Sequence, residues 1–456
     1  MSPPNALSVA WYGDDFTGSA AVMEEFAFAG IESALFLDIP DAEQLARFAS
    51  ARTIGLAGTS RAHSPDWMDQ NLPAPFAFLR GLNASLNLYK ICSTLDSSPK
   101  IGSIGKALAI ARKQFGHGAI PLFPASPKMG RYQCFGTLFA RADQTVYRLD
   151  RHPVVSHHPV TPMDEADVAK HIARQTDDPI GLITLTDLPR VQEVFAALRE
   201  QGIGLVSIDT ASQADLVCCG QLFANLPHGS LIAGSQGVAE ALVEYWRAGN
   251  GENVDGSAKR QPPGGTSSMV GLSGSLSSIT RDQIDQALAD GFVGIQLDTE
   301  RCLGAERQAA VAQSEKAALA ILSEGKSPLI YAARGRDDPA IAKHKRAAMQ
   351  LGLTSEVANQ QIGEALGDVL TQLVKAGAVT RAAIAGGDSS GYALKRLNML
   401  ALTALMPTAP GAGLYRAHPK SFDGATLEVA LKGGQMGSRT YFSDIRDGNQ
   451  SAMDAH

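Results

Sequence analysis

The feature that most constrains this sequence is an alternation of short apolar segments with helix-like segments, which begins near residue 7. An apolar, β-rich segment at 7–12 leads through a Gly/Asp turn into a helix-like segment at 19–30, and a second apolar segment follows at 33–37. This order is the signature of a βαβ unit with parallel strands. Similar alternation recurs at 53–58, 119–123, 180–186 and 204–208. The sequence therefore predicts an α/β fold with mostly parallel sheets.

A break in this pattern divides the chain. Residues 249–268 are rich in Gly, Asn, Pro, Thr and Ser, have no hydrophobic period and cannot bury much apolar surface, which is typical of a linker. The length of 456 residues also exceeds one ordinary domain of roughly 100–200 residues. We therefore expect two α/β domains, at 1–248 and 269–456, joined by the linker.

The charge balance and the cysteine count exclude several classes of protein. The chain has 40 Lys and Arg residues against 46 Asp and Glu residues, a net charge of −6, whereas nucleic-acid-binding domains usually carry a basic excess. Its five cysteines are too few for a disulfide scaffold and lack the Cys-x-x-Cys spacing of a zinc site. Prolines interrupt the histidine cluster at 151–159, so no metal site is expected there.

Membrane and export signals are not found either. No apolar run reaches the roughly 18 residues that a membrane span needs, and residues 1–6 lack the basic and apolar regions of a signal peptide. We therefore expect a cytoplasmic protein without a membrane or nucleic-acid partner. The sequence leaves a homo-oligomer open.

The turn Gly13-Asp14-Asp15-Phe16-Thr17-Gly18 lies where the first predicted strand ends and a helix begins. In open α/β sheets this carboxyl edge is where ligands bind. Two adjacent carboxylates could accept a proton from a substrate hydroxyl or hold a cation. The alternative is a helix N-cap, which explains one aspartate more readily than the pair.

Three Gly-rich turns follow predicted strands in the second domain, at 271–278, 385–391 and 432–437. Glycines let backbone N–H groups approach a phosphate, and a helix N-terminus adds favourable partial charge. The turns lack the Gly-Lys-Ser/Thr ending of a Walker A motif, and each alone could be an ordinary strand–helix turn. We expect them to converge on one edge of a sheet, where they would suit the phosphates of a nucleotide.

Cations and hydroxyls lie close together at several places in the first domain. They occur at 59–61, 90–94, 100–105 and 128–131. In an acidic protein, Arg and Lys beside Gly and Ser turns favour a small anion such as a carboxylate. For any one of these cations, solvation at the surface is the plainer interpretation.

Together these motifs resemble those of the four-carbon acid sugar kinase family, whose members phosphorylate small sugar acids and their oxo derivatives with ATP. The similarity runs nearly end to end and includes Asp14–Gly18, Thr59–Arg61, Cys92–Leu95, Gly102–Gly105, Gly130–Arg131, His158–Met163, Ser273–Ser275, Gly386–Gly391 and Lys432–Gly437. The resemblance implies an N-terminal domain that binds the acid, a C-terminal domain that binds ATP, and an active site in the cleft between them. No Gly-x-Gly-x-x-Gly follows the first strand, which argues against a dinucleotide-dependent oxidoreductase.

The resemblance also implies roles for individual residues. Contacts to ATP would come from Ser273, Ser275, Gly386, Gly387, Asp388, Ser389 and Gly434. Contacts to the acid would come from Asp14, Thr59, Arg61, Ser93, Lys100 and Arg131. Asp15 would be the base, although Asp14 could exchange roles with it. Mg²⁺ would arrive with the nucleotide, so no protein metal site is expected.

Two departures from the family pattern indicate a divergent branch. The segment Cys92-Ser-Thr-Leu-Asp96 stands where the commonest form reads Asp-Ser-Thr-Leu-Arg, so a cation is replaced by an anion, and Lys100 follows four residues later. Lys432–Gly437 reads Lys-Gly-Gly-Gln-Met-Gly instead of Lys-Ser-Gly-Asn-Phe-Gly. Such changes alter which acid fits. Kinases of 3-oxo-isoapionate, tetronate and threonate are the candidates; the alternative is a nucleotide-responsive acid-binding protein without phosphotransfer.

Overall fold

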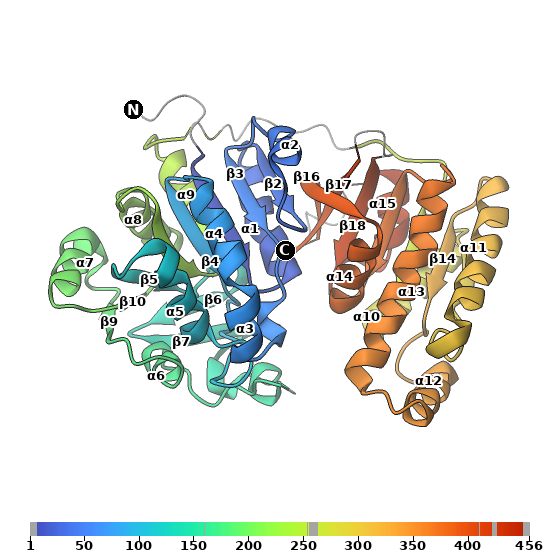
Figure 1. Cartoon of the computed structure of the whole chain (residues 1–456), viewed down its shortest axis with the longest axis horizontal. Coiled ribbons are helices and arrows are strands. Elements are labelled where there is room, and N and C mark those ends of the chain that lie inside the picture. The colour runs from blue at the N-terminus through green and yellow to red at the C-terminus, as the bar shows by residue number, and fades with distance from the viewer. Residues whose placement is uncertain are drawn as a thin grey trace. The chain divides into compact units, whose positions relative to one another are not determined.

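The computed structural model describes residues 7–158, 160–252, 254, 263–409, 411–421 and 426–449. The chain forms two compact units, Met1–Ala258 and Lys259–His456 (Figure 1). Each unit has a largely parallel sheet with helices packed against it, which confirms the predicted α/β class with two domains. Residues 253 and 255–262 of the predicted linker at 249–268 lie outside the described residues. The cleft between the domains stays a prediction.

The main sheet of the first unit is parallel, with strands in the order β2-β3-β1-β4-β11-β5-β10-β9. Its strands are β1 (Val9–Gly13), β2 (Ser33–Phe36), β3 (Thr53–Leu56), β4 (Leu86–Lys90), β5 (Ile120–Phe123), β9 (Ile180–Ile183), β10 (Leu205–Ile208) and β11 (Ser230–Gly234). The predicted segments at 33–37, 53–58, 119–123, 180–186 and 204–208 each contain one of these strands. β1 lies between β3 and β4, so the carboxyl ends of these three strands meet at one edge.

Helices and a small second sheet complete the first unit. The helices are α1 (Phe16–Phe28), α2 (Ala42–Ala46), α3 (Pro65–Asn71), α4 (Pro73–Gly81), α5 (Ile104–Phe115), α6 (Val168–Ala173), α7 (Val191–Glu200), α8 (Gln213–Ala224) and α9 (Gly237–Arg247). An antiparallel sheet consists of β6 (Arg131–Cys134), β7 (Thr137–Ala142) and β8 (Thr145–Arg148). The indole of Trp11 is buried in β1 and donates a hydrogen bond to the Ser19 carbonyl of α1, 3.1 Å away, which ties the helix to the sheet.

The sheet of the second unit has the order β13-β14-β12-β15-β18-β17-β16. Its strands are β12 (Val270–Ser273), β13 (Val293–Gln296), β14 (Pro328–Tyr331), β15 (Arg381–Ala385), β16 (Met399–Ala409), β17 (Ala412–Pro419) and β18 (Leu427–Lys432). Pairing is parallel from β13 to β18, whereas β17 pairs antiparallel with both β18 and β16. The antiparallel hairpin was not expected from the sequence.

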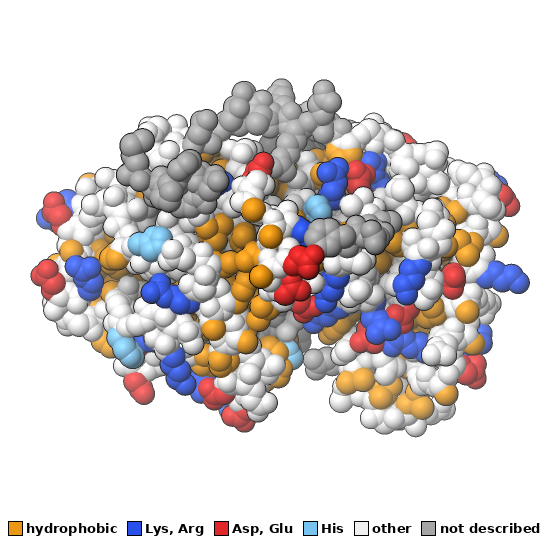
Figure 2. Space-filling model, turned by 45° about the horizontal axis from the view of Figure 1, so that its top comes forward, with side chains coloured by type: hydrophobic (Ala, Val, Ile, Leu, Met, Phe, Trp, Pro, Cys, Tyr) orange, Lys and Arg blue, Asp and Glu red, His pale blue; other side chains and the backbone are white. Residues whose placement is uncertain are grey.

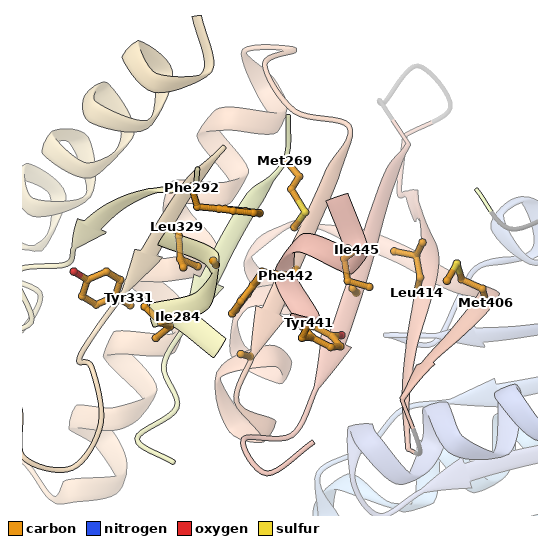
Figure 3. Packing of buried hydrophobic residues seen from close by; sticks show 14 residues of the cluster. Met269, Ile284, Phe292, Leu329, Tyr331, Met406, Leu414, Tyr441, Phe442 and Ile445 are labelled. Carbon is orange, nitrogen blue, oxygen red and sulfur yellow. The ribbon is translucent and has the colours of Figure 1, made fainter. Parts of the chain in front are cut away.

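The helices of the second unit are α10 (Ser278–Ala289), α11 (Arg307–Ser323), α12 (Pro339–Gln350), α13 (Ser355–Lys375), α14 (Gly387–Arg396) and α15 (Tyr441–Asp447). Figure 3 shows how α10 and α15 meet the sheet: Ile284 of α10 and Phe442 of α15 pack with Leu329 of β14 in a buried apolar cluster. Small residues on β15, such as Ala383, let the helices approach closely. This packing holds α10 and α15 against the sheet.

The surface of the described residues mixes charges of both signs. On the face that Figure 2 shows, Lys and Arg side chains lie interspersed with Asp and Glu side chains. Within the described ranges, no helix combines the length and the apolar character that crossing a membrane requires. Nor do the described His, Cys, Asp and Glu residues form a group of three that could hold a metal ion.

Candidate functional site

Asp14 and Asp15 follow β1 directly and have different surroundings. Asp15 is the N-cap of α1, and its Oδ1 atom accepts a hydrogen bond from the Gly18 amide at 2.9 Å. Asp14 is 3% exposed, and its own amide donates to the Lys90 carbonyl of β4, also at 2.9 Å. Capping therefore explains Asp15, while the buried carboxylate of Asp14 needs a different reason.

Arg61 provides that reason. It lies in the short helical turn after β3, and its Nε and Nη2 atoms donate to Oδ2 and Oδ1 of Asp14 at 3.1 and 2.7 Å. The same Nη2 atom donates to Oδ1 of Asp15 at 2.8 Å. Burial raises the pKa of Asp14 above its ordinary value, and the charge of Arg61 opposes that rise. One guanidinium thus holds both carboxylates in place.

The loop after β4 contains the departure from the family pattern. The carboxylate of Asp96 is partly buried and accepts hydrogen bonds from the Thr94 hydroxyl at 2.9 Å and the Cys92 thiol at 3.2 Å. Burial raises the pKa of the Cys92 thiol, so the thiol is a hydrogen-bond donor and a poor nucleophile. Asp96 is therefore held by hydrogen bonds from two side chains of its own loop. Sequence analysis had not predicted these partners.

The other residues predicted to bind the acid differ in burial and in hydrogen-bond partners. Arg131 begins β6, and its Nη1 atom donates to the Met129 carbonyl at 3.0 Å. Its Nε atom is buried and has no hydrogen-bond partner among the described residues. Ser93 is partly buried, the Thr59 hydroxyl lies 3.3 Å from a ring nitrogen of His63, and Lys100 is exposed. Arg131 thus has a buried donor that a ligand could satisfy, whereas Lys100 lies in solvent.

The three Gly-rich turns of the second unit converge, as predicted. They follow the neighbouring strands β12, β15 and β18. A β-carbon placed on Gly274 would lie 2.1 Å from Oγ of Ser389, and one placed on Gly434 would lie 2.4 Å from Oγ of Ser275. Gly386 has φ 126°, a conformation that side chains rarely adopt. Close approach of the turns therefore depends on glycine.

A cavity of about 630 Å³ opens on these turns. Residues of the turns line it, namely Gly274, Ser275, Gly386, Gly387, Ser389 and Gly434. Apolar side chains also line it: Ile341 and Met349 from α12, Ile362 from α13 and Leu353 from the loop between these helices. A cavity with Gly-rich turns and apolar side chains in its lining suits a ligand that has phosphates and an aromatic base. Ser273 does not line this cavity; its hydroxyl is buried without a partner in the described part. Asp388 belongs to the first turn of α14.

Lys432 begins the third Gly-rich turn without lining the cavity, and the sequence analysis had given it no role of its own. Its ammonium is buried and donates to the Thr280 hydroxyl and the Gly433 carbonyl, each at 3.2 Å. Burial lowers the pKa of Lys432 to about 8. The Gly434 carbonyl accepts a 2.8 Å bond from Thr280, so α10 holds this turn closed. In the sequence, the signal that pointed to Lys432 was its position at the start of the Lys432–Gly437 motif.

Comparisons with known proteins identify both units. Residues 9–242 match the model of a sugar-binding N-terminal domain, and residues 270–442 match that of a nucleotide-binding C-terminal domain. The chain is 39% identical to the 3-oxo-isoapionate kinase of Paraburkholderia graminis, over 98% of this chain and 95% of that protein. The chain belongs to the four-carbon acid sugar kinase family. It is also 32% identical to the 3-oxo-tetronate kinase of Pseudomonas fluorescens, over 97% of each chain.

Solved structures share the fold of this family member. A crystal structure of a Salmonella typhimurium LT2 protein is 22% identical, covers 96% of this chain and 98% of its own, and has a TM-score of 0.76. A crystal structure of a Haemophilus influenzae protein is also 22% identical, covers 95% of this chain and 98% of its own, and has a TM-score of 0.71. At this identity the likeness concerns the fold alone.

Proposed function

We propose that this chain transfers the γ-phosphoryl group of ATP to a hydroxyl of 3-oxo-isoapionate. As a member of the family, the chain is an ATP-dependent sugar-acid kinase. The observation that favours this acid is the 39% identity to a 3-oxo-isoapionate kinase over 98% of the chain, against 32% to a 3-oxo-tetronate kinase. The departure at Cys92 and Asp96 supports an acceptor that differs from the family's commonest one.

The first unit is proposed to hold the acid and accept its proton. The carboxylate of the acid would bind the free Nε atom of Arg131, with Ser93 and Thr59 donating to its oxygens. Asp15 would accept the proton of the attacking hydroxyl, because its carboxylate is the more exposed of the pair, with 27% of its side chain accessible against 4% for Asp14. Asp14 would fix the orientation of Arg61, and Arg61 that of Asp15.

The second unit is proposed to hold ATP. The amides and hydroxyls of Ser275, Gly387, Ser389 and the Gly434 turn would donate to the phosphates, and the apolar side chains that α12 and α13 contribute to the cavity would pack on the base. Phosphoryl transfer needs positioning and charge stabilisation more than covalent chemistry. Bound Mg²⁺ would neutralise part of the triphosphate charge. The ion would come bound to the nucleotide.

The test is ADP release, coupled to an indicator enzyme, with 3-oxo-isoapionate, 3-oxo-tetronate, threonate and tetronate. We expect the highest kcat/KM with 3-oxo-isoapionate. Asp15→Asn should abolish turnover and leave ATP affinity unchanged, because it removes the proton acceptor while the cap remains. The matched control is Asp41→Asn, another N-cap aspartate, whose Oδ1 accepts from Gln44 at 2.8 Å.

The outcomes separate the alternatives. Full activity of Asp15→Asn would refute the assignment of the base. Preferential turnover of another acid would refute the proposal that 3-oxo-isoapionate is the substrate. Intact ATP binding without turnover of any acid would leave a nucleotide-responsive binding protein as the function.

A further inference from the structure

A second cation lies beside the aspartate pair, on β4. Lys90 is 2% exposed, and the one hydrogen bond that its Nζ atom makes among the described residues goes to the Ile91 carbonyl at 2.8 Å. Burying an ammonium costs free energy that a single neutral carbonyl does not offset. The lysine therefore needs a negative neighbour or a function that explains its burial.

The start of α1 shows which neighbour this is. A β-carbon placed on Gly18 would lie 2.4 Å from Nζ of Lys90 and 2.4 Å from Oδ1 of Asp15, so glycine keeps open the space that both groups face. The amides at this helix N-terminus carry partial positive charge and would repel an ammonium. The attraction must come from the carboxylates of Asp14 and Asp15. Strand register places them there, since Lys90 pairs with Gly13.

We propose that Lys90 is a positioning residue of the phosphoryl-transfer site, whose buried ammonium keeps Asp14 charged and the aspartate pair correctly oriented. The inference rests on the proposed function. Arg61 holds the pair through direct hydrogen bonds, and Lys90 provides the second positive charge through space. With Lys90 in place, the pair of carboxylates faces a pair of cations.

The electrostatics around Asp14 support this arrangement. Burial raises the pKa of Asp14, Asp15 raises it further, and Arg61 and Lys90 oppose the rise. The phenols of Tyr12 and Tyr89 and the thiol of Cys92 also face this carboxylate, and each has a raised pKa, so all three are neutral near pH 7. Loss of the ammonium would raise the pKa of Asp14 further, so Asp14 would ionise only at higher pH.

The first test replaces Lys90 with methionine, which keeps the volume and removes the charge. An opposite charge nearby shifts a carboxyl pKa by roughly 1–3 units. We therefore expect the acid limb of kcat to move up by about one pH unit, so that kcat falls about tenfold on the acid side of that limb. Activity should recover towards pH 8.5, and ATP affinity should not change. Lys106→Met is the control, because Lys106 pairs with Asp69 at 2.7 Å on α5.

A second variant leaves every charge in place. Gly18→Ala would push Nζ of Lys90 and Oδ1 of Asp15 apart, and it should lower kcat about tenfold without moving KM for ATP. Gly81→Ala is its control, because a β-carbon there meets no atom within 4 Å. If Lys90→Met does not fold, Gly18→Ala tests whether Lys90 is a positioning residue.

The proposal is overturned if a folded Lys90→Met, or Gly18→Ala, has the kcat and pH profile of wild type. The proposed function fails instead if wild type releases no ADP with any acid. Urea unfolding between pH 4 and 8 then tests Lys90 without turnover. A carboxyl with a raised pKa contributes stability at low pH that is lost as pH rises through that pKa. In Lys90→Met this loss should extend to higher pH; an unchanged dependence would also overturn the proposal.

Discussion

Gly274→Ala is expected to weaken ATP binding by displacing one hydroxyl of the converging turns. The new β-carbon would lie 2.1 Å from Oγ of Ser389, closer than such atoms can approach, and 3.0 Å from its Cβ, which is a tight contact. The contact with Leu366, at 3.6 Å, is an ordinary one, so the strain falls on Ser389. Its hydroxyl must rotate or shift out of the cavity.

The size of the effect follows from the bond that is lost. A hydrogen bond to a charged group contributes about 1.5–3 kcal/mol. Because about 1.4 kcal/mol corresponds to a factor of ten, Kd for ATP should rise by roughly 10- to 150-fold. Acid binding in the first unit should stay as in wild type.

The assay is calorimetric titration of the folded variant with ATP and Mg²⁺, with Gly391→Ala measured in parallel. Gly391 belongs to the same motif, and a β-carbon there meets nothing within 4 Å. In that control we expect unchanged ATP affinity and a gain of about 0.5–1 kcal/mol in helix stability. ATP affinity of Gly274→Ala within twofold of wild type would refute the phosphate role of these turns. Equal weakening in both variants would show that the loss is not specific to Ser389.

Three further predictions concern charged groups. Arg131→Met should raise KM for the acid about 10- to 150-fold through loss of a charged hydrogen bond, with KM for ATP unchanged; equal changes in both constants would contradict this. Burial raises the pKa of Glu240 to about 7, so stability present below its unfolded pKa is lost as pH rises through 7. Glu240→Gln, which can still accept from Ser126, should abolish that loss in urea unfolding at pH 5 and 7.5. Burial lowers the pKa of Lys432 from 10.5 to about 8. The free energy of unfolding should therefore rise with pH between these values, and this rise should be absent in Lys432→Met.

Sequence patterns located several strands but not every one. The strands β2, β3 and β10 are short apolar runs between turn residues, and such runs were predicted correctly. β4 and β11 were missed; in β4 the polar residues Asn87 and Lys90 interrupt the apolar run. The antiparallel pair β16 and β17 was missed because strand direction depends on pairing with a distant segment.

The sequence by itself determined the local chemistry of this protein: the Asp14–Asp15 turn after a strand, the Gly-rich turns and the break between domains. These are properties of neighbouring residues, because a turn needs its own glycines and a cap its own carboxylate. Tertiary structure decided which groups interact across the chain. It brought Arg61 within hydrogen-bond distance of both aspartates and Lys90 close to them, because parallel strands bring distant carboxyl ends to one edge of the sheet. Burial at this edge makes the free energy of each charge depend on the other charges.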